Sequence, residues 1–92
     1  MKEPLPNADA KKLIRAILGD GTVSYTGHAK TEMAKDQLTG VDVVNVLRGG
    51  WVEFSEEVAG SWRYRVRTNT IHVVVAFRSD TNLVVVTAWR HQ

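Results

Sequence analysis

The segment Trp62-Arg63-Tyr64-Arg65-Val66-Arg67 alternates between large apolar residues and arginines. Successive side chains of a β-strand point to opposite faces of the sheet, so this alternation predicts a strand with one apolar face and one face of arginines. The apolar face suits a protein core, whereas the planar guanidinium groups suit the phosphates of a nucleic acid. A solvated outer face, on which Glu53 pairs with one arginine, is an equally consistent interpretation.

The same two-residue period extends over the second half of the chain. It predicts four strands, at about residues 51–58, 61–68, 71–78 and 83–90. A two-residue turn at Asn69-Thr70 would pair the second and third strands antiparallel, with Arg67 opposite His72 and Arg65 opposite Val74. This register is supported because it gathers the apolar residues of both strands on one face: Trp62, Tyr64, Val66, Val73, Val75 and Phe77.

The register of the last strand depends on the turn at residues 79–82. A four-residue turn there puts Thr87 opposite Val74 and Trp89 opposite His72. The face opposite the apolar one would then collect basic, polar and aromatic side chains: Arg65, Arg67, His72, Thr87 and Trp89.

The first half of the chain has helical spacing instead. Residues 1–7 contain both prolines and are expected to form a tail, so the predicted domain covers residues 8–92. Three helices are expected: one capped by Asn7 or Asp9 and ended by Gly19, one over about 28–35, and one that runs from a Thr39–Asp42 capping box to Gly49-Gly50. Residues 20–24 are expected to form a loop. The predicted fold class is α+β, with two or three N-terminal helices packed on one face of a four-stranded antiparallel sheet.

Composition sets broad limits on the function. The 92 residues suit one domain, and 43% hydrophobic with 24% charged residues is typical of a globular protein. The absence of cysteine excludes disulfides and thiolate metal sites, and it favours a cytoplasmic location. The histidine spacing fits no metal site, no segment is long and apolar enough to cross a membrane, and no cofactor is expected. The net charge of +2 is too small to indicate a nucleic-acid partner by itself.

His28 is the candidate for proton transfer near neutral pH. It follows Thr26-Gly27 at the start of a predicted helix, where the helix dipole disfavours the imidazolium and keeps the base form available. From the spacing alone, an exposed or capping histidine is the favoured interpretation. Among the tryptophans, Trp89 and Trp51 could stack on bases, but a core position is the favoured interpretation for Trp51 and Trp62.

Several short motifs resemble a family of small bacterial domains. They are Tyr25-Thr26-Gly27-His28-Ala29-Lys30-Thr31-Glu32-Met33, Val43-x-x-Val46-Leu47, Trp62 to Val66, Val73-Val74-Val75 and Val86-Thr87-Ala88-Trp89. Members of this family typically carry His-Ala-x-x-Arg-Met and a last strand that ends in a threonine–aromatic pair. Some are encoded beside antitoxins of the MqsA type. The family is similar to a wider group that contains RelE-like toxins, barnase, EndoU and tRNA-cutting colicins.

The resemblance implies a RelE/barnase-like fold and a toxin-like, metal-independent ribonuclease, with RNA and a cognate antitoxin as partners. It implies catalytic roles for His28, Arg65 and Thr87. The other basic and aromatic residues of the arginine-bearing face, together with one basic residue of the second helix, are candidates for holding RNA and its phosphates: Arg63, Arg67, Lys30, His72 and Trp89.

Two departures from the family pattern favour a different role. Glu32 stands where the family has arginine before Met33, and Asp36-Gln37-Leu38 replaces Arg-Gly-Ile. Both changes remove positive charge near the expected site. The alternative hypotheses are therefore a non-catalytic RNA- or protein-binding module of the same fold, and a regulatory subunit that docks a partner through its sheet face.

Overall fold

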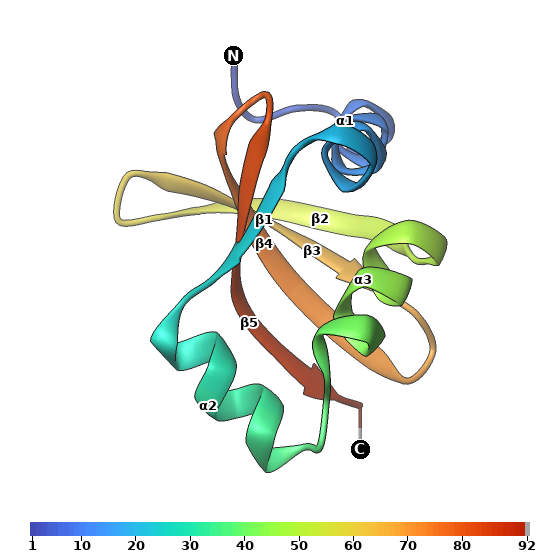
Figure 1. Ribbon diagram of the computed structural model, residues 1–92. Helices are drawn as coiled ribbons and strands as arrows, with labels where there is room; N and C mark the ends of the chain where they lie inside the picture. The colour runs from blue at the N-terminus through green and yellow to red at the C-terminus, as the bar shows by residue number, and fades with distance from the viewer. Residues whose placement is uncertain (92) are drawn as a thin grey trace.

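The residues with two-residue periodicity form four of the five strands in the computed structural model, which describes residues 1–91. Three helices and one additional strand, β1, come from the first half of the chain, so the α+β class is confirmed (Figure 1). The sheet order is β1-β5-β4-β3-β2. In chain order the elements are α1 (Asn7–Asp20), β1 (Thr22–Tyr25), α2 (Gly27–Lys35), α3 (Gly40–Gly49), β2 (Trp51–Val58), β3 (Ser61–Arg67), β4 (Ile71–Ser79) and β5 (Asn82–Arg90).

The prediction of a four-stranded antiparallel sheet is wrong at one edge. Strand β1, in a segment predicted to be a loop, pairs parallel with β5 from Thr22↔Asn82 to Tyr25↔Val85. The other neighbouring pairs are antiparallel, so the sheet is mixed. Although β1 contains good strand formers, its four residues are too few to establish a period, and its partner lies at the other end of the chain.

The predicted registers of β3, β4 and β5 are confirmed. Arg67 pairs with His72 and Arg65 with Val74, while Val74 pairs with Thr87 and His72 with Trp89. The last pairing contains two irregularities, one between Phe77 and Ser79 and one between Val74 and Val75. The first shifts the register by one residue and the second shifts it back, so their effects cancel over the second half of β5.

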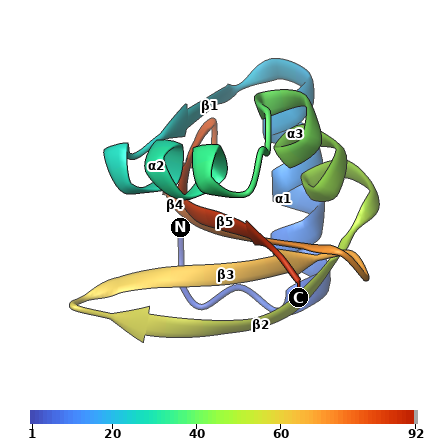
Figure 2. The ribbon, with the colours of Figure 1, turned by 90° about the horizontal axis from the view of Figure 1, so that it is seen from below.

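One apolar cluster lies between the helices and the sheet. Figure 2 shows α1 and α3 on one side of the sheet and α2 beside β5. Each helix contributes buried residues, and the inner face of the sheet supplies the rest of the core: Ala10, Ile14, Ile17, Ala29, Met33, Leu38, Val43, Val46, Leu47, Val52, Tyr64, Val66, Val73, Val75, Phe77, Leu83, Val85 and Ala88. Trp62 packs against this cluster as predicted. Trp51 does not, because Val52 takes the core-facing position and leaves the Trp51 residue 48% exposed.

Two of the three helices, α2 and α3, are capped at their N-termini by a side chain. The Thr39–Asp42 capping box is present at α3, and hydrogen bonds from Thr39 lower the pKa of the Asp42 carboxyl. Helix α2 starts at the side chain of Thr26. The predicted side-chain cap of α1 is wrong, since Pro6 is the N-cap residue and no side chain caps it. At the other end of α3, Lys11 of α1 donates to the carbonyls of Leu47 and Arg48 at 2.9 Å and also to that of Gly50.

The segment before α1 lies against the domain. The backbone N–H of Leu5 donates to the Tyr64 hydroxyl at 2.9 Å, and that hydroxyl donates to Glu3 at 2.8 Å. Burial raises the pKa of Tyr64 to about 12, so the hydroxyl keeps its proton. Within residues 1–91, no helix combines the length and apolar character needed to span a membrane.

Candidate nucleic-acid interface

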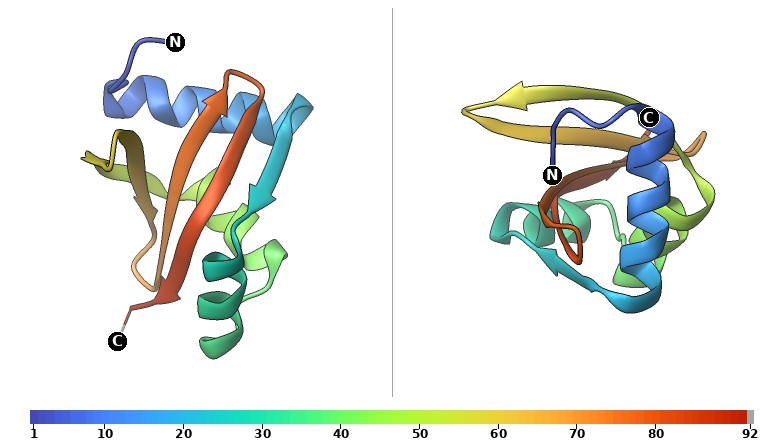
Figure 3. Two further views of the ribbon diagram at one scale, coloured as in Figure 1. Left: turned by 90° about the vertical axis from the view of Figure 1, so that its left-hand side faces the viewer. Right: turned by 90° about the horizontal axis from the view of Figure 1, so that it is seen from above.

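The sheet face that points away from the core, called the outer face below, has three cross-strand rows of side chains. The first row joins Trp51, Arg67, His72 and Trp89 across four strands. The second row joins Phe54, Arg65, Val74 and Thr87 in the same way. In the third row Glu56 pairs with Arg63, and Ala76 pairs with Val84. The left view in Figure 3 looks onto β4 and β5, between the β2–β3 hairpin and α2.

A bulge in β2 supplies the acidic residue of this face. Val52 pairs with Val66 and Phe54 pairs with Arg65, so Glu53 is an extra residue between them. Its Oε2 lies 3.1 Å from Arg67 Nη1, and its Oε1 lies 3.7 Å from Arg65 Nη1. One carboxylate therefore bridges two arginines. The predicted pairing of Glu53 with an arginine is confirmed.

Aromatic rings surround the same two arginines. The guanidinium carbon of Arg65 lies 4.9 Å from the centroid of the Phe54 ring and 5.1 Å from that of Trp89. The corresponding distance from Arg67 to Trp51 is 5.6 Å. These distances are within the range of cation–π attraction. Phe54 and Trp51 are exposed, so their rings remain available to a ligand.

His72 lies under this cluster and is only 4% exposed, whereas the sequence suggested a surface position. Its ring stacks on Trp89 with centroids 4.9 Å apart, and its Nε2 lies 3.2 Å from Nδ1 of His91. Burial lowers the pKa of His72, and Arg67 and Arg65 lower it further. The imidazole is therefore neutral at neutral pH, and His91 is the solvent-exposed member of the pair.

His28 is exposed in the first turn of α2. Two residues earlier, the Thr26 hydroxyl accepts from Ala29 N at 2.9 Å and donates to Val86 O at 3.0 Å. Val86 is the extra residue at the bulge of β5, next to Thr87. The start of α2 is thereby tied to the strand that carries Thr87. No ion pair or hydrogen bond within residues 1–91 links the side chain of His28 to Arg65.

Glu32 and Asp36, the two acidic residues that differ from the family pattern, both have partners in the structure. Glu32 forms an ion pair with Lys35 at 2.8 Å, which lowers the pKa of Glu32. Asp36 accepts from the backbone N–H of Arg90 at 2.8 Å. Glu32 therefore pairs within α2, whereas Asp36 attaches the end of α2 to the end of β5. Lys30 is exposed on α2.

Sequence reasoning missed three contributors to the outer face. Phe54 was missed because the bulge at Glu53 reverses the side on which the next residue points. Trp51 was assigned to the core. His91 follows β5 and is held by a backbone hydrogen bond to Thr70, so only the register of β4 and β5 could have indicated that it lies beside His72.

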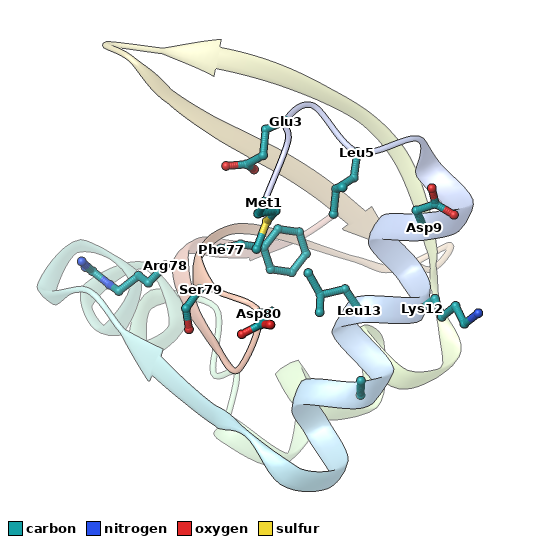
Figure 4. Close-up of a pocket in the computed structure, with 11 residues that line it drawn as sticks. Met1, Glu3, Leu5, Asp9, Lys12, Leu13, Phe77, Arg78, Ser79 and Asp80 are labelled. Carbon is teal, nitrogen blue, oxygen red and sulfur yellow. The ribbon is translucent and has the colours of Figure 1, made fainter.

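A cavity lies on the helix side of the sheet, away from the outer face. This cavity of about 830 Å³ is bounded by the N-terminal segment, α1 and the β4–β5 turn. Figure 4 shows Leu5, Leu13 and Phe77 around it, with Asp9 and Lys12 at its rim. Its mixed rim charges and apolar walls differ from the arginine-rich outer face. Among the described residues, no group of three or more histidines or carboxylates could hold a metal ion.

Comparison with protein families finds one match, to a family described as "Domain of unknown function (DUF4258)", over residues 25–90. The matched region runs from the end of β1 to the last residue of β5. It contains every outer-face residue named above except His91, and it leaves out α1. Searches of curated proteins and of solved structures give no match.

Proposed function

The chain belongs to the DUF4258 family, a family of unknown function, and we propose that it is a toxin-like, metal-independent ribonuclease whose outer face binds single-stranded RNA. The observation that carries the proposal is the position of Arg65 between the Phe54 and Trp89 rings. Proteins bind unpaired nucleic acid through cations that contact phosphates and aromatic rings that stack on bases. Both kinds of group stand side by side here.

The spacing of the arginines also supports an extended strand as the ligand. Arg63, Arg65 and Arg67 alternate along β3, so neighbouring members are about 7 Å apart along the strand. This is close to the separation of successive phosphates in an extended nucleic acid.

The cleavage chemistry needs no metal. The 2′-oxygen attacks the adjacent phosphorus, the bond from phosphorus to the 5′-oxygen breaks, and a 2′,3′-cyclic phosphate and a 5′-hydroxyl result. A base takes the proton of the 2′-hydroxyl and an acid supplies one to the leaving oxygen. We assign one of these transfers to His28, and a water molecule takes or supplies the other proton. Arg65 holds the phosphate as negative charge develops, and Thr87 orients it.

Glu53 has a defined place in this proposal. In the free protein its carboxylate bridges Arg65 and Arg67, where a phosphate would bridge them in the complex. RNA must therefore displace Glu53 from at least one arginine. The same site accounts for a cognate antitoxin as a second partner, since an acidic segment of that protein could cover the arginines in the same manner.

The test is incubation of the purified protein with end-labelled single-stranded RNA in EDTA. Wild type should cut the RNA and leave cyclic phosphate ends. His28→Ala should cut about 10²–10⁴-fold more slowly, the usual loss for a general acid or base. Arg65→Ala should weaken both binding and cleavage. Arg48→Ala, in the last turn of α3, is the matched control and should behave as wild type. Intact RNA after prolonged incubation would contradict ribonuclease activity.

A non-catalytic RNA-binding module is the second candidate. It is favoured by the exposed position of His28, which has no hydrogen-bond partner that fixes its ring within the described part of the chain. This candidate predicts binding of RNA without cleavage, with Arg65→Ala weakening binding and His28→Ala leaving it unchanged.

A further inference from the structure

The outer face is hollowed at its Arg63 end. A cavity of about 410 Å³ lies between the start of α2, the first residues of β3, the last residues of β4 and the first half of β5. Its floor is apolar and is made by Ala76, Val84 and Val86. Its polar lining consists of the arginines Arg63 and Arg78 and the hydroxyls of Thr26 and Ser61.

The two arginines bring positive charge into this cavity without an opposing carboxylate. Among residues 1–91, no aspartate or glutamate lines it. Glu56 is the cross-strand neighbour of Arg63, yet within residues 1–91 neither Arg63 nor Arg78 forms an ion pair. Arg65 and Arg67 differ from them, because the single carboxylate of Glu53 pairs with both and offsets one of their two positive charges. The strongest uncompensated cationic site on the outer face is therefore at the Arg63 end.

The hydrogen-bonding state of Arg63 points to a missing acceptor. Its Nε is buried and, like the Nε of Arg65, has no hydrogen-bond partner within residues 1–91. A buried donor of a charged group without a partner is costly, and an anion that accepts from it would remove this cost. Figure 4 shows the Arg78 side chain extending away from the apolar cavity around Phe77 and Leu13. The α2 N-terminus at Thr26 adds the positive end of a helix dipole to the same lining.

We propose that this cavity binds one phosphate group, and that it anchors the RNA strand more strongly than Arg65 and Arg67 do. That the phosphate belongs to RNA rests on the function proposed above, whereas the anion site itself does not. Within a bound strand, the cavity would hold the phosphate at one end of the arginine row. The neighbouring phosphate would then lie at Arg65, and the next would compete with Glu53 at Arg67.

The test is titration of the isotope-labelled protein with inorganic phosphate, followed by amide chemical shifts and by calorimetry. We expect the largest shifts at Thr26, Arg63 and Arg78. Arg63→Ala and Arg78→Ala should each weaken phosphate binding at least tenfold and more than Arg65→Ala does, while the control Arg48→Ala should leave it within twofold of wild type. Arg63→Lys keeps the charge but loses the Nε donor, so it should lie in between and also controls for misfolding of the alanine variant.

Two results would overturn the inference. One is the absence of phosphate binding by wild type at low salt. The other is a pattern in which the shifts and the losses of affinity centre on Arg65 and Arg67. Failure of the proposed function has a separate signature, since phosphate would then bind in the cavity while single-stranded RNA neither binds nor is cut.

Discussion

The guanidinium carbon of Arg65 lies 5.1 Å from the centroid of the Trp89 ring, so a cation of β3 and an aromatic ring of β5 meet across the intervening strand β4. Val74 of β4 pairs with both Arg65 and Thr87, and the next row of the sheet pairs His72 with both Arg67 and Trp89. The relationship depends on the register of three strands. It brings together on one surface the cation that we propose to bind phosphate and the ring that we propose to stack on bases.

The role of Glu53 as an internal competitor leads to the first prediction. Glu53→Gln removes the bridging charge from Arg65 and Arg67 and should strengthen the binding of single-stranded RNA. Because partly exposed ion pairs contribute up to about 1 kcal/mol, the expected gain is up to about fivefold at low salt. Fluorescence anisotropy with a labelled oligonucleotide measures it. Asp20→Asn, at the end of α1, is the matched control, since it changes the net charge equally at an exposed residue that makes no ion pair within residues 1–91; equal gains in both variants would show a nonspecific charge effect.

The burial of His72 leads to a prediction about pH. The folded state lowers the pKa of His72, mainly through burial and then through Arg67, Arg65 and His91, while Glu53 acts in the opposite direction. Below about pH 6.5, the ordinary pKa of histidine, the unfolded chain binds more protons at this site than the folded one. The free energy of unfolding should therefore decrease as the pH falls from 7.5 to 5.

Chemical denaturation at several pH values measures this dependence. His72→Gln, which carries no charge at any of these pH values, should reduce the slope of stability against pH. His28→Gln is the control, because it removes a histidine that is exposed rather than buried. An unchanged slope in His72→Gln would contradict the assignment of the pH dependence to this imidazole.

The Tyr64 hydroxyl provides a test of the N-terminal segment. Tyr64→Phe removes the acceptor of Leu5 N and the donor to Glu3. The cost should be about 1 kcal/mol, typical of a hydrogen bond, and the Leu5 amide should exchange with solvent faster. Hydrogen exchange and denaturation measure the two effects. Tyr25→Phe serves as the comparison, and the segment would not be held by this hydroxyl if both variants exchanged alike at Leu5.

Two adjacent glycines at the end of α3 should respond oppositely to alanine. A Cβ at Gly50 would lie 2.5 Å from the carbonyl oxygen of Arg67 and 2.6 Å from that of Val46, so Gly50→Ala forces backbone atoms apart. It should cost about 1–3 kcal/mol, as overpacking does. At Gly49 a Cβ would meet nothing within 4 Å. Gly49→Ala should therefore be neutral or stabilise the helix by up to about 1 kcal/mol. Similar thermal shifts in the two variants would contradict the close packing at Gly50.

Much of the sheet could be predicted because its signals are local. The alternation in β3 and β4 and the short turn at Asn69-Thr70 determine which side chains share a face, and the Arg67–His72 pairing follows from them. The capping box of α3 is likewise contained in four residues. Where a pattern and its turn lie close together in the sequence, the observed structure agrees with it.

The features that could not be predicted depend on contacts between distant segments. Strand β1 is defined by its pairing with β5, and the burial of His72 depends on Trp89 and His91. The two-residue alternation in the sequence of β2 does not indicate the bulge that lets Glu53 reach two arginines. The hollow beside Arg63 arises because α2 starts near the bulge at Val86, which no local pattern indicates.

The most direct measurement of the central claim is chemical-shift mapping of the labelled protein with a single-stranded oligoribonucleotide that carries 2′-O-methyl groups and so cannot be cut. The proposal predicts that the perturbed residues lie on the outer face, above all at Arg63, Arg65, Thr87 and Trp89, and that the affinity falls as salt increases because phosphate contacts release counterions. Shifts confined to α1 and α3, or no shifts at RNA concentrations that saturate other single-strand binders, would contradict the assignment of the outer face to RNA.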